Sequence, residues 1–169
     1  SLLSGLGAAV LGSDTIPTIA SGSTFLSALG VAILAVPGPL GEELGWRGFM
    51  LPRLLGTWSP LASGFILGCI WAAWHLPAFF LSGSPQQEFA LPLFLLGAVA
   101  LSMMVTWLFI RANGSVLISI LFHLMANEAN DLTGVSFEAF AVGTIICALL
   151  LVASGQLRDS PARPDAMTK

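Results

Sequence analysis

Long apolar stretches separated by short polar segments make up most of the 169-residue chain. A helix needs about 20 mainly apolar residues to cross the hydrocarbon core of a bilayer. The pattern therefore predicts an all-α fold, a polytopic membrane helical bundle with about five transmembrane helices. The predicted helices cover residues 23–55, 59–80, 91–110, 115–130 and 137–152.

Proline and serine residues mark where these helices begin or bend. Pro37-Gly38-Pro39 interrupts the first apolar stretch, so the first helix is predicted to be kinked or broken there. Ser59 and Ser115 precede later helices in the position of N-caps. Pro60 then occupies the first helical position, where its missing N–H group costs nothing.

The composition supports a membrane protein and excludes some partners. Hydrophobic residues make up 56% of the chain and charged residues only 9%, whereas soluble domains contain about 25% charged residues. The six Lys and Arg residues are too few for a nucleic-acid binder, so the expected partners are membrane lipids. Cys69 and Cys147 lie in apolar stretches and are interpreted as small hydrophobic residues.

Basic residues lie at or after the ends of the first, third and fifth predicted helices. The loops 82–87 and 131–136, at the opposite ends, contain none. Because short cytoplasmic loops are enriched in Lys and Arg, all basic ends are predicted to be cytoplasmic. We therefore expect a multi-pass integral membrane protein of the plasma (inner) membrane with a cytoplasmic C-terminal tail. The basic residues concerned are Arg53, Arg111, Arg158, Arg163 and Lys169.

Three segments follow from these patterns. Residues 1–19 do not resemble a signal peptide and are interpreted as the remnant of a preceding helix or loop. Residues 20–155 form one helical membrane domain. Residues 156–169 are polar and contain proline, which predicts a disordered tail.

Several polar side chains lie inside the apolar helices, where one ionisable group costs at least about 2.5 kcal/mol. Helical rise places those of the first, second and fourth helices at overlapping depths. Scattered solubilising residues would not share a depth in this way, so we expect these side chains to meet around one pocket. They are Glu42, Glu43, Arg47, His75, His123, Asn127 and Glu128.

The spacing of these residues suggests different roles. Glu43 and Arg47 are four residues apart and can pair on one helix face. Glu42 is turned away by about 100°, so it is left to take a proton or to find a metal, a histidine or a water, as a general base does. His123 and Asn127 also share a helix face, where they can either join helices or serve a site.

Taken singly, the remaining residues have ordinary explanations. His75 by itself fits an interfacial position in an aromatic belt, and Glu128 fits the solvated end of a helix. The five tryptophans are interpreted as packing and interface residues rather than as a ligand site. They are Trp46, Trp58, Trp71, Trp74 and Trp107.

Two chemistries use the same side chains. In the first, Glu42, His75 and His123 hold a catalytic zinc ion with an open position. In the second, which needs no metal, Glu42 and His75 activate water while His123 and Asn127 donate hydrogen bonds to an oxyanion. The spacing leaves both open.

Three ordered motifs resemble one protein family. They are Glu42-Glu43-Leu44-Gly45-Trp46-Arg47, Trp71-Ala72-Ala73-Trp74-His75 and His123-Leu124-Met125-Ala126-Asn127. The chain resembles the CPBP family of intramembrane proteases, also called the Abi or CAAX protease family, which includes the type II CAAX prenyl endopeptidases. The family pattern is E-E-x-x-x-R, F-x-x-x-H and H-x-x-x-N or H-x-x-x-D, and the chain has Trp71 in place of the phenylalanine.

The resemblance implies an intramembrane endopeptidase, described in the family either as a metalloprotease or as a glutamate-dependent enzyme. It assigns water activation to Glu42 and His75, oxyanion stabilisation to His123 and Asn127, and supporting roles to Glu43 and Arg47. The implied substrate is a membrane-embedded or lipidated peptide, either a prenylated CAAX-type peptide or a secreted one. The alternative is a non-catalytic membrane immunity or scaffold protein that binds a peptide or helix in the same cavity. Family members are generally longer, with further helices before the first motif.

Overall fold

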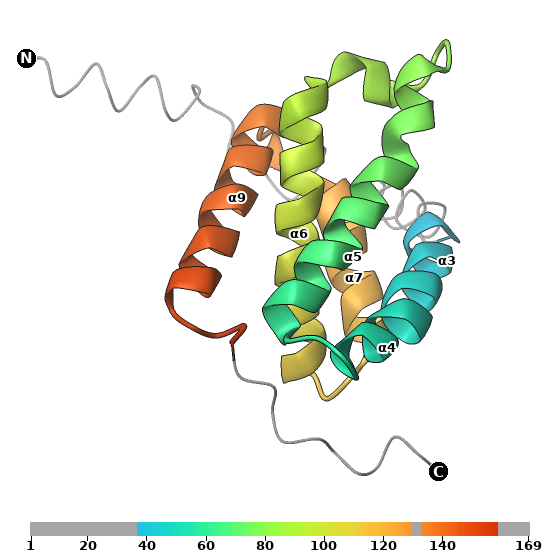
Figure 1. Ribbon diagram of the computed structural model, residues 1–169. Helices are drawn as coiled ribbons and strands as arrows, with labels where there is room; N and C mark the ends of the chain where they lie inside the picture. Colours follow the sequence, from blue (N-terminus) through green and yellow to red (C-terminus); the bar gives the residue numbers. More distant parts are fainter. Residues whose placement is uncertain (1–36, 130–132, 159–169) are drawn as a thin grey trace, which may run out of the picture. The chain divides into compact units, whose positions relative to one another are not determined.

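A computed structural model describes residues 37–129 and 133–158 of the chain (Figure 1). Within these residues every regular element is helical, which confirms the predicted all-α class. The predicted N-terminal remnant and the first part of the first predicted helix lie outside the described residues. The elements are α3 (Pro37–Gly45), the π-helical η1 (Trp46–Met50), α4 (Leu51–Leu55), α5 (Pro60–His75), the 3₁₀-helical η2 (Leu76–Phe80) and η3 (Pro85–Glu88), α6 (Leu91–Arg111), α7 (Val116–Asn127) and α9 (Phe137–Ala153).

Serine caps begin three of the helices. Ser59 Oγ accepts a hydrogen bond from the Ala62 amide at 3.2 Å, and Ser115 Oγ accepts one from the Ile118 amide at 3.4 Å. Both predicted N-caps are therefore confirmed, since each satisfies an amide that has no partner within its helix. Ser136 caps α9 in the same way.

Pro37 and Pro39 lie in the first described turn of α3, at the edge of the described residues. The kink or break expected at these prolines stays a prediction, because the residues before Pro37 lie outside the described residues. An irregular segment follows α3, the π-helical η1 between α3 and α4. Pro52 follows it and cannot donate to the carbonyl four residues earlier, which explains why regular α-helical bonding gives way just before this proline.

Helices α5 and α6 pack together along most of their length. Gly64 and Gly68 of α5 are four residues apart and allow the two backbones to approach, as small residues do in membrane helix pairs. A Cβ atom on Gly68 would lie only 2.9 Å from the Cα of Val99, and one on Gly64 would lie 3.1 Å from Thr106 Oγ1. This close contact fixes the helix that carries His75 against its neighbour.

Substituting Gly68 by alanine should therefore lower the free energy of unfolding by about 1–3 kcal/mol, because the new methyl group meets backbone atoms. Gly143→Ala in α9 is the matched control, since nothing lies within 4 Å of its added Cβ, and it should leave stability unchanged or raise it slightly. SDS-induced unfolding in mixed micelles measures both values. Equal stabilities of the two variants would contradict the packing described for α5 and α6.

Several polar side chains lie within the largely apolar core of this bundle, and many large apolar side chains lie on its surface. Phe65, Leu96 and Leu149 are among the exposed apolar residues, and a hydrocarbon environment removes the cost of exposing them. Two described helical stretches, Pro60–Phe80 and Leu91–Arg111, are long and apolar enough to cross a membrane, and α7 and α9 are shorter. The fold is that of an integral membrane protein. The buried polar residues are Glu43, Arg47, Ser63, Ser102, Thr106, Ser119, His123 and Thr144.

The described arginines outside the core, Arg53, Arg111 and Arg158, lie at one end of the bundle, as the loop pattern predicts. Arg111 and Trp107 at the end of α6 both donate to Gln156, which follows α9. The amide of Leu61 at the start of α5 donates to the carbonyl of Leu157 at 3.0 Å, so the α4–α5 connection lies at this same end. The cytoplasmic location of that end stays a prediction.

One boundary of the sequence analysis needs correction. The packed chain continues past residue 155, because Leu157 is only 1% exposed and its backbone bonds to α5. Residues 156–158 therefore belong to the bundle rather than to the predicted disordered tail. The rest of that tail, residues 159–169, lies outside the described residues.

Candidate active site

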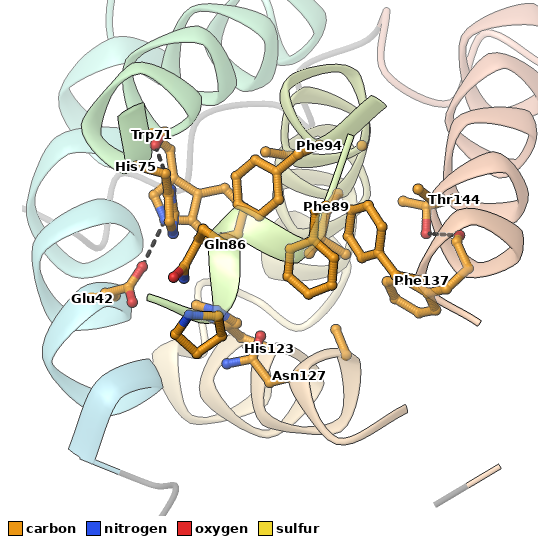
Figure 2. Close-up of a pocket in the computed structure, with 17 residues that line it drawn as sticks. Glu42, Trp71, His75, Gln86, Phe89, Phe94, His123, Asn127, Phe137 and Thr144 are labelled. Atoms are coloured by element: carbon orange, nitrogen blue, oxygen red, sulfur yellow. Dashed lines mark hydrogen bonds between the residues drawn. The ribbon is translucent and has the colours of Figure 1, made fainter. Parts of the chain in front are cut away.

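A cavity of about 430 Å³ lies between the helices that carry the three motifs (Figure 2). Four predicted site residues line it: Glu42 from α3, His75 from α5, and His123 and Asn127 from α7. The structure thus brings together side chains that are up to 85 positions apart in the chain. Of the seven residues expected to meet around one pocket, these four do so, whereas Glu43, Arg47 and Glu128 do not line the cavity.

Glu43 and Arg47 lie behind this cavity rather than in it. Arg47 Nη1 donates to Glu43 Oε1 at 2.8 Å, and both side chains are 0% exposed, so the pair predicted from their spacing is confirmed. His123 Nδ1 is 2.9 Å from the same Glu43 oxygen. Arg47 also donates through Nη2 to Ser102 Oγ of α6 at 3.3 Å. The buried carboxylate of Glu43 therefore holds the ring of His123 in place through this hydrogen bond.

Glu42 has a hydrogen-bond partner that its position in the sequence did not reveal. The indole Nε1–H of Trp71 donates to Glu42 Oε2 at 2.6 Å. One carboxylate oxygen is thereby oriented by α5, and the side chain stays partly exposed to the cavity. A carboxylate held in this way can still accept a proton from a water molecule.

The structure also indicates which nitrogen of His75 is free. His75 Nδ1 lies 2.8 Å from the backbone carbonyl of Trp71. A carbonyl only accepts hydrogen bonds, so Nδ1 carries the proton and Nε2 of the neutral ring has a lone pair. The interfacial interpretation of His75 taken alone is therefore incomplete, because the ring lines the cavity with an acceptor available.

Trp71, which was predicted to be a packing residue, contacts several of the candidate site residues. Its ring makes edge contacts with both histidines, at centroid distances of 5.3 Å to His75 and 5.1 Å to His123. The Arg47 guanidinium carbon lies 5.3 Å from the centre of the same ring. Trp71 thus contacts His75, His123 and Glu42 at once, and only its place four residues before His75 could have indicated this.

The predicted zinc ligands are not arranged as a metal site in this structure. Among the residues that the structure describes, no three His, Cys, Asp or Glu side chains are grouped so that they could hold a metal ion. In the described structure, the side chains of Glu42, His75 and His123 are therefore not arranged to hold a metal ion together. Zinc stays an expectation from the family resemblance.

The far side of the cavity is aromatic. Phe89 stacks on Phe137 with ring centroids 4.1 Å apart, and Phe94 lies 5.3 Å from His75. The cavity therefore joins a polar wall, with a carboxylate, two imidazoles and an amide, to an apolar wall. The residues of the polar wall could be predicted from the sequence. The phenylalanines could not, since Phe is common in membrane helices and gives no signal of a site.

The structure is thus an all-α membrane bundle in which one carboxylate, two histidines and an amide line a common cavity. The family model for type II CAAX prenyl endopeptidases, Rce1-like, matches residues 24–129. The chain belongs to this family. All three motifs fall within the matched residues.

A curated relative agrees with this membership. The chain is 28% identical over 120 residues to "CAAX prenyl protease 2" of Methanococcus maripaludis. The match covers 67% of this chain and 43% of the archaeal protein. The chain thus spans less than half the length of that relative.

Proposed function

We propose that the chain carries the catalytic site of an intramembrane endopeptidase, which hydrolyses a peptide bond of a membrane-bound substrate. The observation that supports this most is the single cavity lined by Glu42, His75, His123 and Asn127. Membership of the prenyl endopeptidase family agrees with it.

Glu42 and His75 are proposed to activate the attacking water. The carboxylate of Glu42 accepts a proton from the water while the His75 Nε2 lone pair accepts a second hydrogen bond from it. The water oxygen then bonds to the carbonyl carbon of the substrate, and the carbonyl π electrons move to the oxygen. The product of this step is a tetrahedral oxyanion and a protonated Glu42.

His123 and Asn127 are proposed to stabilise that oxyanion. Because His123 Nδ1 donates to the Glu43 carboxylate, its Nε2 can donate a hydrogen bond to the oxyanion only when the ring is an imidazolium. Asn127 supplies an amide N–H group. When the intermediate collapses, the C–N bond breaks, and the proton held by Glu42 passes to the leaving amine.

A substrate with an apolar group beside its scissile bond fits a cavity with one polar and one aromatic wall. A prenylated CAAX-type peptide has this character, and so does an apolar secreted peptide. The name of the archaeal relative favours the prenylated class. We therefore propose a farnesylated C-a-a-X peptide as the first substrate to test.

The test is hydrolysis by the purified full chain in liposomes, with a fluorogenic farnesylated C-a-a-X peptide and its unprenylated counterpart. We expect one internal bond to be cleaved, identified by mass spectrometry, and faster cleavage of the farnesylated peptide. The same assay after chelation tests the cofactor, since activity that is lost and then restored by zinc would support the zinc ligand set. Saturable binding of the peptides without hydrolysis would overturn the protease and support the non-catalytic immunity or scaffold alternative.

A further inference from the structure

A short turn outside the three motifs forms part of the cavity wall. The 3₁₀ helix η3 connects η2 to α6, and its Pro85 and Gln86 line the same cavity as Glu42 and His123. Figure 2 shows the Gln86 side chain directed toward the space next to Glu42 and His123. No motif and no sequence pattern pointed to this residue.

The Gln86 amide is oriented by a neighbouring side chain. Ser84 Oγ donates a hydrogen bond to Gln86 Oε1 at 2.5 Å. An amide side chain has one oxygen acceptor and two N–H donors. With its oxygen engaged by Ser84, Gln86 has its two N–H donors available for a molecule in the cavity.

The backbone of the turn is held at both ends. The Ser84 amide donates to the Leu81 carbonyl at 3.1 Å, and the Phe89 amide donates to the Gln86 carbonyl at 3.1 Å. Phe89 in turn stacks on Phe137 of α9. Gln86 is therefore positioned before any substrate arrives, and little ordering entropy is lost when it binds one.

The adjacent glutamine has a different environment. Gln87 Nε2 donates to the Phe79 carbonyl of η2 at 3.4 Å, and Gln87 is not among the residues that line the cavity. Two identical side chains, neighbours in one turn, thus differ in whether they face the cavity. This difference provides a matched control.

We propose that Gln86 is a substrate-binding residue that donates a hydrogen bond to a main-chain carbonyl of the peptide in the cavity. This rests on the proposed function. Glu42 and His75 Nε2 present acceptors to the cavity, and a peptide that enters it brings carbonyl groups that need donors when they leave water. A neutral amide donor matches a neutral carbonyl acceptor without adding a charge.

The first experiment compares Gln86→Ala with Gln87→Ala in the farnesylated-peptide assay. Loss of one neutral hydrogen bond to substrate should raise KM about 3- to 10-fold with kcat nearly unchanged, and Gln87→Ala should match the wild type. Gln86→Glu keeps the size and the acceptor for Ser84 but removes both N–H donors, so it should raise KM at least as much. Equal KM values for Gln86→Ala, Gln87→Ala and the wild type would overturn the proposal, as would a fall in kcat with unchanged KM.

A binding measurement separates this proposal from the proposed function. In a Glu42→Gln background, the dissociation constant of a fluorescent farnesylated C-a-a-X peptide is measured by anisotropy, with and without Gln86→Glu. A 3- to 10-fold weakening supports the role of Gln86 even if the wild-type chain hydrolyses nothing. Unchanged affinity overturns it even if hydrolysis is observed. Thermal unfolding of each variant confirms that the compared proteins are equally folded.

Discussion

Replacing Glu42 by glutamine is expected to lower kcat about 10²- to 10⁴-fold while the protein stays folded. The amide of glutamine still offers an oxygen to the Trp71 indole N–H, which bonds Glu42 in the structure. It cannot accept a proton from water, and general-base catalysis contributes a factor of this size. The measurement is single-turnover hydrolysis of the farnesylated peptide in liposomes.

Glu138→Gln is the matched control, because Glu138 lies exposed in the first turn of α9 and does not line the cavity. It should leave kcat within about twofold of the wild type. A Glu42→Gln variant with the same activity as this control would exclude Glu42 as the base. If cells expressing the chain were protected against a peptide toxin and this persisted in Glu42→Gln, the non-catalytic alternative would be favoured.

The helices could be predicted because their signals are local. Ser59 and Ser115 cap the helices that they precede, and the apolar runs end where α5 and α6 end to within a few residues. The packing of Leu157 against α5 could not be predicted, since it depends on a neighbour distant in the chain. Local periodicity carries no information about such contacts.

The same distinction applies to the site. The Glu43–Arg47 pair follows from a four-residue spacing, whereas the bond from His123 to the same carboxylate joins residues 80 positions apart. Shared depth predicted that the polar residues meet, but it gave no orientation for any ring. The roles of Trp71 and Gln86 became visible only with side-chain contacts, because neither residue type is unusual in its segment.

Glu43→Leu is expected to lower the free energy of unfolding by about 3–5 kcal/mol, the cost of leaving a buried charge without its partner. Arg47 is 0% exposed and donates to Glu43 at 2.8 Å, and its other described side-chain partner is the neutral Ser102. SDS-induced unfolding measures the loss. The adjacent Glu42→Gln should show nearly wild-type stability in the same assay, because Glu42 lines the cavity rather than the core.

The double variant Glu43→Leu/Arg47→Met separates the stability of the bundle from the positioning of His123. Replacing both members of a buried ion pair by apolar residues removes the unpaired charge, so most of the lost stability should return. The activity should not return with it, because His123 Nδ1 has lost the carboxylate that orients its ring. Thermal unfolding and kcat are measured on the same preparation. Recovery of both together would show that Glu43 contributes only to folding and that His123 needs no carboxylate for its proposed role.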